Sequence, residues 1–278
     1  MLAKVRDLPP VSVAGLRLVG LLERPEIGND DVVPVLKQDA VLTAKLLRAC
    51  NSPVLGLREP IASVDHAVLL LGHRQILQMV TAFAFRGLLS VPVWAYALEA
   101  DGLWRHSLLS ATAAELVLAE GLDLDLSGPA AFTLGLLHDI GKLVVSRFLD
   151  RQSLVAIRGQ IAQGSALCEA ERDVLGTDHA EVGAGLLHLW GLPTQIVEAI
   201  AAHHRPVCGP RPQPSALVWL ADFVAHRAEG AYSGREVNVP ETGSVALEAL
   251  GFNPETLDGL VGRAYESFQH TGVVILAG

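Results

Sequence analysis

A histidine and an aspartate stand side by side in the motif LLHDIGK, at positions 138 and 139, within the largely apolar segment 134–144. Burying an unpaired carboxylate costs several kcal/mol, so Asp139 requires a metal ion, a cationic partner or several hydrogen-bond donors. Imidazole nitrogen and carboxylate oxygen together suit Fe, Mn, Zn, Ni or Co, and in hydrolytic sites such an ion lowers the pKa of a bound water. His138 and Asp139 therefore predict one end of a site for a divalent transition metal.

The remaining candidate ligands lie on separate predicted helices. They are His106 after Trp104, His179 at a helix start, His203 and His204 at a helix end, and Asp222 within the segment WLADFV. Helix bundles commonly build metal sites from side chains on facing helices, so large separation in the sequence is compatible with one site. Adjacent helical residues point about 100° apart. We therefore expect one of the two neighbouring histidines to face the site and the other to contact a second ion or a supporting residue.

Each of these residues also has an interpretation that needs no metal. His106 is compatible with a surface or capping histidine, His179 with the neighbour of a helix N-cap, and Asp222 with half of an internal ion pair. The C-terminal end of a helix favours a protonated imidazole, which accounts for one of His203 and His204. Taken singly, each residue stays open between a structural and a metal-binding role, and only the whole set predicts a metal site.

Lys142 follows His138 by four residues and Asp139 by three, so it is expected on the same helical face. There its ammonium group contacts a phosphate oxygen, neutralises Asp139 or is simply solvated, and the sequence leaves these alternatives open. The other histidines lack an acidic or paired neighbour in an equally apolar frame. We assign structural roles to this group, which consists of His66, His73, His188, His226 and His270.

Helical periodicity predicts the elements that position these residues. Apolar residues recur at helical spacing over 11–22, Asn29 and Asp39 are expected to cap the next two helices, and Ser63 caps a helix that breaks at Gly72 before 73–89. Further helices are predicted near 94–120, 129–149, 151–163, 166–175, 178–190, 193–204, 214–229, 243–251 and 254–270. No segment alternates convincingly between apolar and polar residues, so we predict an all-α fold. We expect residues 1–278 to form a single two-lobed domain, with an N-terminal helical lobe over about 1–92 and a second lobe over about 93–278.

The composition argues against several classes of protein. Half of the residues are hydrophobic and 18% are charged, which favours packed helices over disorder. The formal net charge of −9 offers no attractive field to a phosphate backbone, so direct nucleic-acid binding is not expected. Apolar runs end well before the roughly 18 to 20 residues of a bilayer span, and the amino terminus lacks the apolar core of a secretory signal. Cys50, Cys168 and Cys208 form no C-x-x-C pair, so we expect reduced cysteines in a cytoplasmic protein without a membrane segment.

The ordered set of histidines and aspartates resembles a known superfamily. The order His106, His138-Asp139, His179, His203-His204, Asp222 resembles the HD superfamily of metal-dependent phosphohydrolases, most closely the arrangement in HD-GYP phosphodiesterases. The runs LPP, KQDAVLTAKLLRACNSP, IASVDHAVLLLG, HDIGK and GLLHLWGLPTQIVEAIAAHH resemble the HDOD family over about residues 8–225. This resemblance implies an HD-type helical core and a role in bacterial signalling, because HDOD domains are regarded as regulatory relatives of HD phosphohydrolases. Many members of the family have lost ligand residues.

The sequence departs from these relatives in three respects. The full ligand order is kept, which implies a bound divalent metal. The segment RPVCGPRPQP after His204 contains no Gly-Tyr-Pro signature, which argues against specific hydrolysis of cyclic di-GMP. Gly102, one helical turn before His106, offers no additional carboxylate for a third ion. We therefore expect one or two ions.

Two functional hypotheses follow from the resemblance. In the first, a regulatory signalling domain binds a partner protein or a nucleotide ligand, and a metal site is retained at His106, His138, Asp139, His179, His203, His204 and Asp222. In the second, the chain is a metal-dependent phosphohydrolase acting on a nucleotide or cyclic dinucleotide, with Asp139 at the metal and Lys142 at the phosphate. We favour the first, because hydrolysis also needs an open coordination position.

Overall fold

The computed structural model describes residues 8–24, 26–56, 59–122, 124–209, 211–233 and 241–277, and within these ranges every extended regular element is a helix. An isolated bridge between Val93 and Leu98 is the one strand-like pairing in those ranges. The all-α prediction is therefore confirmed. Most of the amino-terminal segment used to argue against a secretory signal lies outside the described residues.

The helices run in the following order. The N-terminal part contains α1 (Val13–Gly20), η2 (Leu21–Glu23), α2 (Asn29–Lys37), α3 (Ala40–Cys50), η3 (Pro53–Leu55), α4 (Val64–Leu89) and η4 (Trp94–Tyr96). The middle contains α5 (Gly102–Ala119), α6 (Gly128–Leu137), α7 (Gly141–Phe148), α8 (Arg151–Ala162), α9 (Leu167–Leu175), α10 (His179–Leu189) and α11 (Thr194–Ala201). The last elements are η5 (Pro206–Cys208), α12 (Pro212–Ser233), α13 (Glu241–Leu250), η6 (Pro254–Thr256) and α14 (Leu257–Ala277).

Side-chain caps fix several helix starts. The Asp39 carboxylate accepts the backbone N–H groups of Val41 and Leu42, and the Ser63 hydroxyl accepts that of His66, as predicted. The predicted cap at Asn29 is wrong, because α2 already begins at that residue and Gly28 precedes it. There the Asp31 carboxylate reaches back to the Gly28 N–H over 3.0 Å, so the first turn supplies the cap from within.

Two long predicted helices are broken in the structure. The predicted helix 94–120 contains the short η4, followed by Ala97 and Asp101 with positive φ, and α5 starts only at Gly102. The predicted helix 129–149 is divided at 138–140 into α6 and α7. The predicted break at Gly72 is confirmed, because Gly72 has φ 79° and ψ 153° inside α4, a conformation that side-chain-bearing residues rarely adopt.

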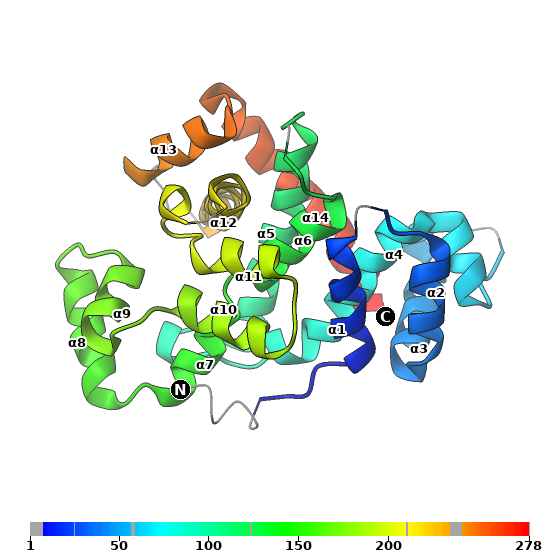
Figure 1. Cartoon of the computed structure of the whole chain (residues 1–278), viewed down its shortest axis with the longest axis horizontal. Coiled ribbons are helices and arrows are strands. Elements are labelled where there is room, and N and C mark those ends of the chain that lie inside the picture. Colours follow the sequence, from blue (N-terminus) through cyan, green and yellow to red (C-terminus); the bar gives the residue numbers. More distant parts are fainter. Residues whose placement is uncertain are drawn as a thin grey trace.

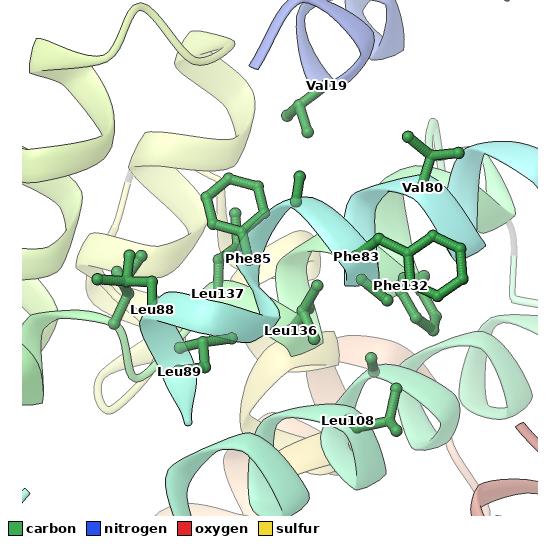
Figure 2. Close-up of a cluster of buried hydrophobic side chains, with 14 of the residues drawn as sticks. Val19, Val80, Phe83, Phe85, Leu88, Leu89, Leu108, Phe132, Leu136 and Leu137 are labelled. Carbon is green, nitrogen blue, oxygen red and sulfur yellow. The ribbon is translucent and has the colours of Figure 1, made fainter. Parts of the chain in front are cut away.

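Helix α4 runs through the core. Figure 2 shows Phe83, Phe85, Leu88 and Leu89 of α4 beside Leu136 and Leu137 of α6, with Leu108 of α5 and Val19 of α1 nearby. By length and composition α4 could cross a membrane, but 56% of its most apolar window is buried within the protein. Core packing therefore accounts for its hydropathy.

The arrangement of helices leaves a central region that holds the candidate site. Figure 1 shows α2 and α3 at one end of the long axis, α8 and α9 at the other, and α5, α6 and α10 to α12 between them. Helix α5 packs against α6, α12 and α14. One hydrophobic cluster includes Leu18 of α1, Leu137 of α6 and Ile275 of α14, so packing is continuous across the predicted lobe boundary near residue 92.

A partly buried acid between α4 and α5 gives a stability prediction. Burial raises the pKa of Glu115 to about 8, and its carboxyl group accepts a hydrogen bond from the Gln78 amide. Between the ordinary pKa near 4.5 and this value, the folded state holds a proton that the unfolded state has lost, so stability falls as pH rises. The free energy of unfolding, measured in urea, should fall between pH 5 and pH 9 in wild type. In Glu115→Gln, which has no proton to lose, this fall should be smaller by on the order of 2 kcal/mol. Equal losses would contradict the burial of this acid.

Candidate metal centre

The structure brings all seven predicted ligand residues together. His106 comes from α5, His138 and Asp139 from the turn between α6 and α7, His179 from the start of α10, His203 and His204 from the turn after α11, and Asp222 from α12. His106 Nε2 lies 2.9 Å from Asp222 Oδ1 and 3.8 Å from Asp139 Oδ2. His138 Nε2 lies 3.5 Å from each of these two oxygens. His179 Nε2 lies 3.3 Å from Asp139 Oδ1 and 2.7 Å from His204 Nε2. The cluster is almost wholly buried, with Asp139 only 1% exposed.

A tight turn aims His138 and Asp139 inward. Here the backbone changes to bonds that span three residues, from the Ile140 N–H to the Leu137 carbonyl and from the Lys142 N–H to the Asp139 carbonyl. Gly141 then begins α7 in direct contact with the backbone of α10. A Cβ added at Gly141 would lie 1.9 Å from the His179 carbonyl oxygen. The turn and this glycine thus place the motif against the first residue of α10.

The four most buried histidines have the same orientation. In each of them Nδ1 faces an acceptor on the outer side of the cluster: Gly135 O for His138 at 2.8 Å, Ile200 O for His203 at 2.7 Å, Glu171 Oε2 for His179 at 2.6 Å and Glu229 Oε2 for His106 at 3.3 Å. A backbone carbonyl can only accept, so Nδ1 of His138 and of His203 carries the proton. The Nε2 atoms of these two rings therefore point into the cluster. Outer partners of this kind orient histidines that bind metals.

Several of the inward atoms have no hydrogen-bond partner. Nε2 of His138, Nε2 of His203 and Oδ1 of Asp139 are buried and unsatisfied. When the imidazoles are neutral all three atoms are acceptors, and a cation is a partner that would satisfy them together. Donor atoms bound at about 2.0–2.2 Å to one ion lie roughly 3–3.5 Å apart, close to the separations among His106, His138 and Asp222. The residues present therefore fit a divalent transition metal.

The electrostatics of the cluster lead to the same conclusion. Burial acts to raise the pKa of Asp139, but Lys142 and His138 together hold it well below the usual range, so the carboxylate is ionised. Burial opposes protonation of His106 and His138, yet neighbouring carboxylates raise their pKa values to about 9 and about 10. Burial lowers the pKa of His203 to about 3, so that ring stays neutral. Without an ion, two protonated imidazoles balance the buried carboxylates, a role that a divalent cation can take.

Lys142 is not solvated. Its side chain is 12% exposed and its ammonium group pairs with Asp139, so of the three alternatives the structure supports neutralisation of Asp139. The same ammonium lies 5.7 Å from the centre of the Tyr96 ring. Tyr96 donates its hydroxyl hydrogen to Glu171 at 2.5 Å, and Glu171 in turn receives the Nδ1–H of His179. Lys142 is thus held by a connected polar network at the edge of the cluster.

His203 and His204 both lie at the site. The predicted divergence of about 100° assumed that the two residues are helical, and they are not. Helix α11 ends at Ala201, so the two residues lie in a turn and their ring centres are only 3.9 Å apart. His203 is fully buried next to His138, with ring centres 5.2 Å apart, whereas His204 is partly exposed and touches His179. The two histidines thus differ in burial, although both lie at the cluster.

Sequence reasoning missed four residues at the site: Tyr96, Glu171, His226 and Glu229. His226 had been assigned a structural role, yet its Nε2 lies 3.3 Å from Asp222 Oδ1. The spacing in α12 carries the signal, since residues four and seven positions after Asp222 share its helical face. Gly102 on α5 offers no carboxylate near His106. Glu229 on α12 places one there.

Comparisons with known proteins identify the family and the fold. A curated protein of Treponema pallidum (strain Nichols) is 24% identical over 207 residues, which are 72% of this chain and 38% of the relative. The chain thus spans less than half of that relative's length. Among solved structures, an HDOD domain protein from Geobacter sulfurreducens is 26% identical with a TM-score of 0.69, and the alignment covers 96% of this chain and 92% of that one.

Two further solved structures share the fold. A candidate phosphohydrolase from Shewanella amazonensis SB2B has a TM-score of 0.69 at 23% identity, over 99% of this chain and 96% of that one. A candidate signal transduction protein from Marinobacter aquaeolei VT8 has a TM-score of 0.77 at 20% identity, over 99% of this chain and 61% of that one. The HDOD domain matches residues 8–206, which leaves Asp222 beyond the match although it lies in the cluster. With most of its length matched, the chain belongs to the HDOD domain family.

Proposed function

We propose that this chain is a regulatory signalling domain that acts by binding a partner protein or a nucleotide ligand and that retains an HD-type metal centre. Membership of the HDOD family and the similarity to a candidate signal transduction protein support the regulatory role. The cluster of inward-facing histidine and aspartate atoms supports the metal centre. We place the protein in the cytoplasm as part of the same proposal.

The observation that carries the metal centre is the shared orientation of its imidazoles. Four Nδ1 atoms face outer acceptors, while the buried Nε2 atoms of His138 and His203 and Oδ1 of Asp139 have no hydrogen-bond partner. His106, His138, Asp139 and Asp222 would hold one ion. His179, His203 and His204 would hold a second, with Asp139 between the two groups. Mixed nitrogen and oxygen donors suit Fe, Mn, Zn, Ni or Co.

A phosphohydrolase is the second candidate function, and Lys142 is the observation that favours it. Its ammonium group pairs with Asp139 at the edge of the cluster, and once an ion takes over that pairing it would be available to a phosphate oxygen of a nucleotide or cyclic dinucleotide. Metal ions in such centres activate a bound water and stabilise the charge that develops on phosphorus. In this role Asp139 would position the ion and Lys142 the phosphate. The fold is shared with a candidate phosphohydrolase.

Metal analysis and hydrolysis assays on the same preparation separate the two functions. We expect purified wild type to contain one or two transition-metal ions per chain and to leave phosphodiester and phosphomonoester substrates intact when Mn²⁺ is added. Asp139→Asn should retain the fold, judged by circular dichroism, and lose the metal. Metal-dependent turnover in wild type that is absent in Asp139→Asn would instead establish the phosphohydrolase. Wild type that neither contains nor takes up metal would contradict the metal centre itself.

A further inference from the structure

One more histidine lies at the solvent side of the cluster. His226 follows Asp222 by one helical turn on α12, and its Nε2 is 3.3 Å from Asp222 Oδ1. Its ring centre lies 4.5 Å from that of His106, and one ligand atom from each of His106, Asp222 and His226 lies within 4.8 Å of the others. The His226 side chain is 50% exposed, whereas His106 is 7% exposed. These three residues therefore form a donor group that opens outward.

Glu229 lies behind both histidines of this group. Its Oε2 lies 3.3 Å from Nδ1 of His106 and 3.8 Å from Nδ1 of His226. With both Nδ1 atoms directed at one carboxylate, both Nε2 atoms face the same oxygen of Asp222, at 2.9 Å and 3.3 Å. The buried histidines are oriented in the same way, with Nδ1 towards an outer acceptor and Nε2 towards the cluster. Carboxylates behind metal-binding histidines fix the ring and raise its basicity.

We propose that His226 is a further ligand of the ion held by His106 and Asp222, with Glu229 as the residue that positions both histidines. The inference rests on the proposed metal centre. The side of the ion that faces solvent is where a hydrolytic centre keeps a position open for water. His226 occupies that side with a protein donor. With His226 added to His106, His138, Asp139 and Asp222, five protein residues would donate to the ion, which would leave less room for water and favour binding over turnover.

The test compares Mn²⁺ binding in wild type, His226→Ala and His188→Ala. His188 is an exposed histidine of α10 away from the cluster and serves as the matched control. Affinity is measured by competition with a chelator, and water-proton relaxation of the Mn²⁺-loaded proteins counts exchanging waters on the ion. His226→Ala should bind Mn²⁺ about tenfold or more weakly, since even outer partners of ligands contribute 10–100-fold. Relaxation per bound ion should rise because water enters the vacated position.

The outcomes distinguish this inference from the function on which it rests. Wild type and His188→Ala should behave alike. If His226→Ala matches them in both affinity and relaxation, His226 is not a ligand and the metal centre stands. If wild type takes up no Mn²⁺, the proposed centre and the role of His226 are both overturned. Should His226→Ala fail to fold, His226→Gln provides the same comparison, because its amide is a poor metal ligand.

Discussion

Replacing Asp139 with alanine is expected to lower the free energy of unfolding by about 3–5 kcal/mol and to abolish metal binding. The carboxylate is 1% exposed and pairs with the buried ammonium of Lys142, while its oxygens face His106, His138 and His179. Removing one partner of a buried pair leaves the other charge uncompensated, and that loss sets the magnitude. Urea unfolding followed by circular dichroism measures the stability, and elemental analysis measures the metal.

A double variant separates the ion pair from the metal centre. Asp139→Ala with Lys142→Met removes both charges, so a large part of the lost stability should return. Metal binding should not return, because the central carboxylate is still missing. Wild-type stability in Asp139→Ala would contradict the burial of the pair. Metal retained in either variant would contradict the position of Asp139 between the two groups of histidines.

Gly141→Ala is expected to destabilise the fold by about 3 kcal/mol or more and to weaken metal binding. The added Cβ would lie 1.9 Å from the His179 carbonyl oxygen and 2.5 Å from the Gly183 nitrogen. Both neighbours are backbone atoms, which cannot turn away as a side chain can, so α7 and α10 must separate. Overpacking usually costs about 1–3 kcal/mol, and contacts this short lie at or beyond the upper end. Any separation also moves His179 away from Asp139.

Gly159→Ala is the matched control for this variant. Gly159 lies within α8 on the surface, and no atom outside its own helix backbone comes within 4 Å of an added Cβ. Alanine there should stabilise the protein by about 0.5–1 kcal/mol, because glycine is a poor helix former. Thermal unfolding of the two variants beside wild type gives the comparison. Equal tolerance of both substitutions would show that α7 does not contact α10 as described.

The all-α fold and the composition of the cluster could be predicted from the sequence for definite reasons. Apolar periodicity and side-chain caps such as Asp39 act locally, so they are readable without any tertiary contact. The seven clustered residues were predictable as a set because His138 and Asp139 need a compensating charge in their apolar frame, and because the resemblance to HD proteins supplied the order of the others. Their mutual distances depend on helix packing, which the sequence does not display.

The misses have physical causes as well. The break at 138–140 carries no proline, and it lies next to the contact of Gly141 with α10, which joins segments about 40 residues apart. Glu171 belongs to α9, and the turn between α9 and α10 brings it next to His179. The two residues are on different helices, so their separation in the sequence does not indicate the contact. His226 was recoverable, because its position four residues after Asp222 places it on the same helical face.

Anomalous diffraction from crystals grown with a transition metal would show directly whether the cluster binds metal ions. We expect an anomalous peak bonded at about 2.0–2.2 Å to Nε2 of His106, Nε2 of His138 and a carboxylate oxygen of Asp222. A second peak is expected among His179, His203 and His204. Crystals grown with Mn, Fe, Zn, Ni or Co that show no peak among these residues would contradict the metal centre.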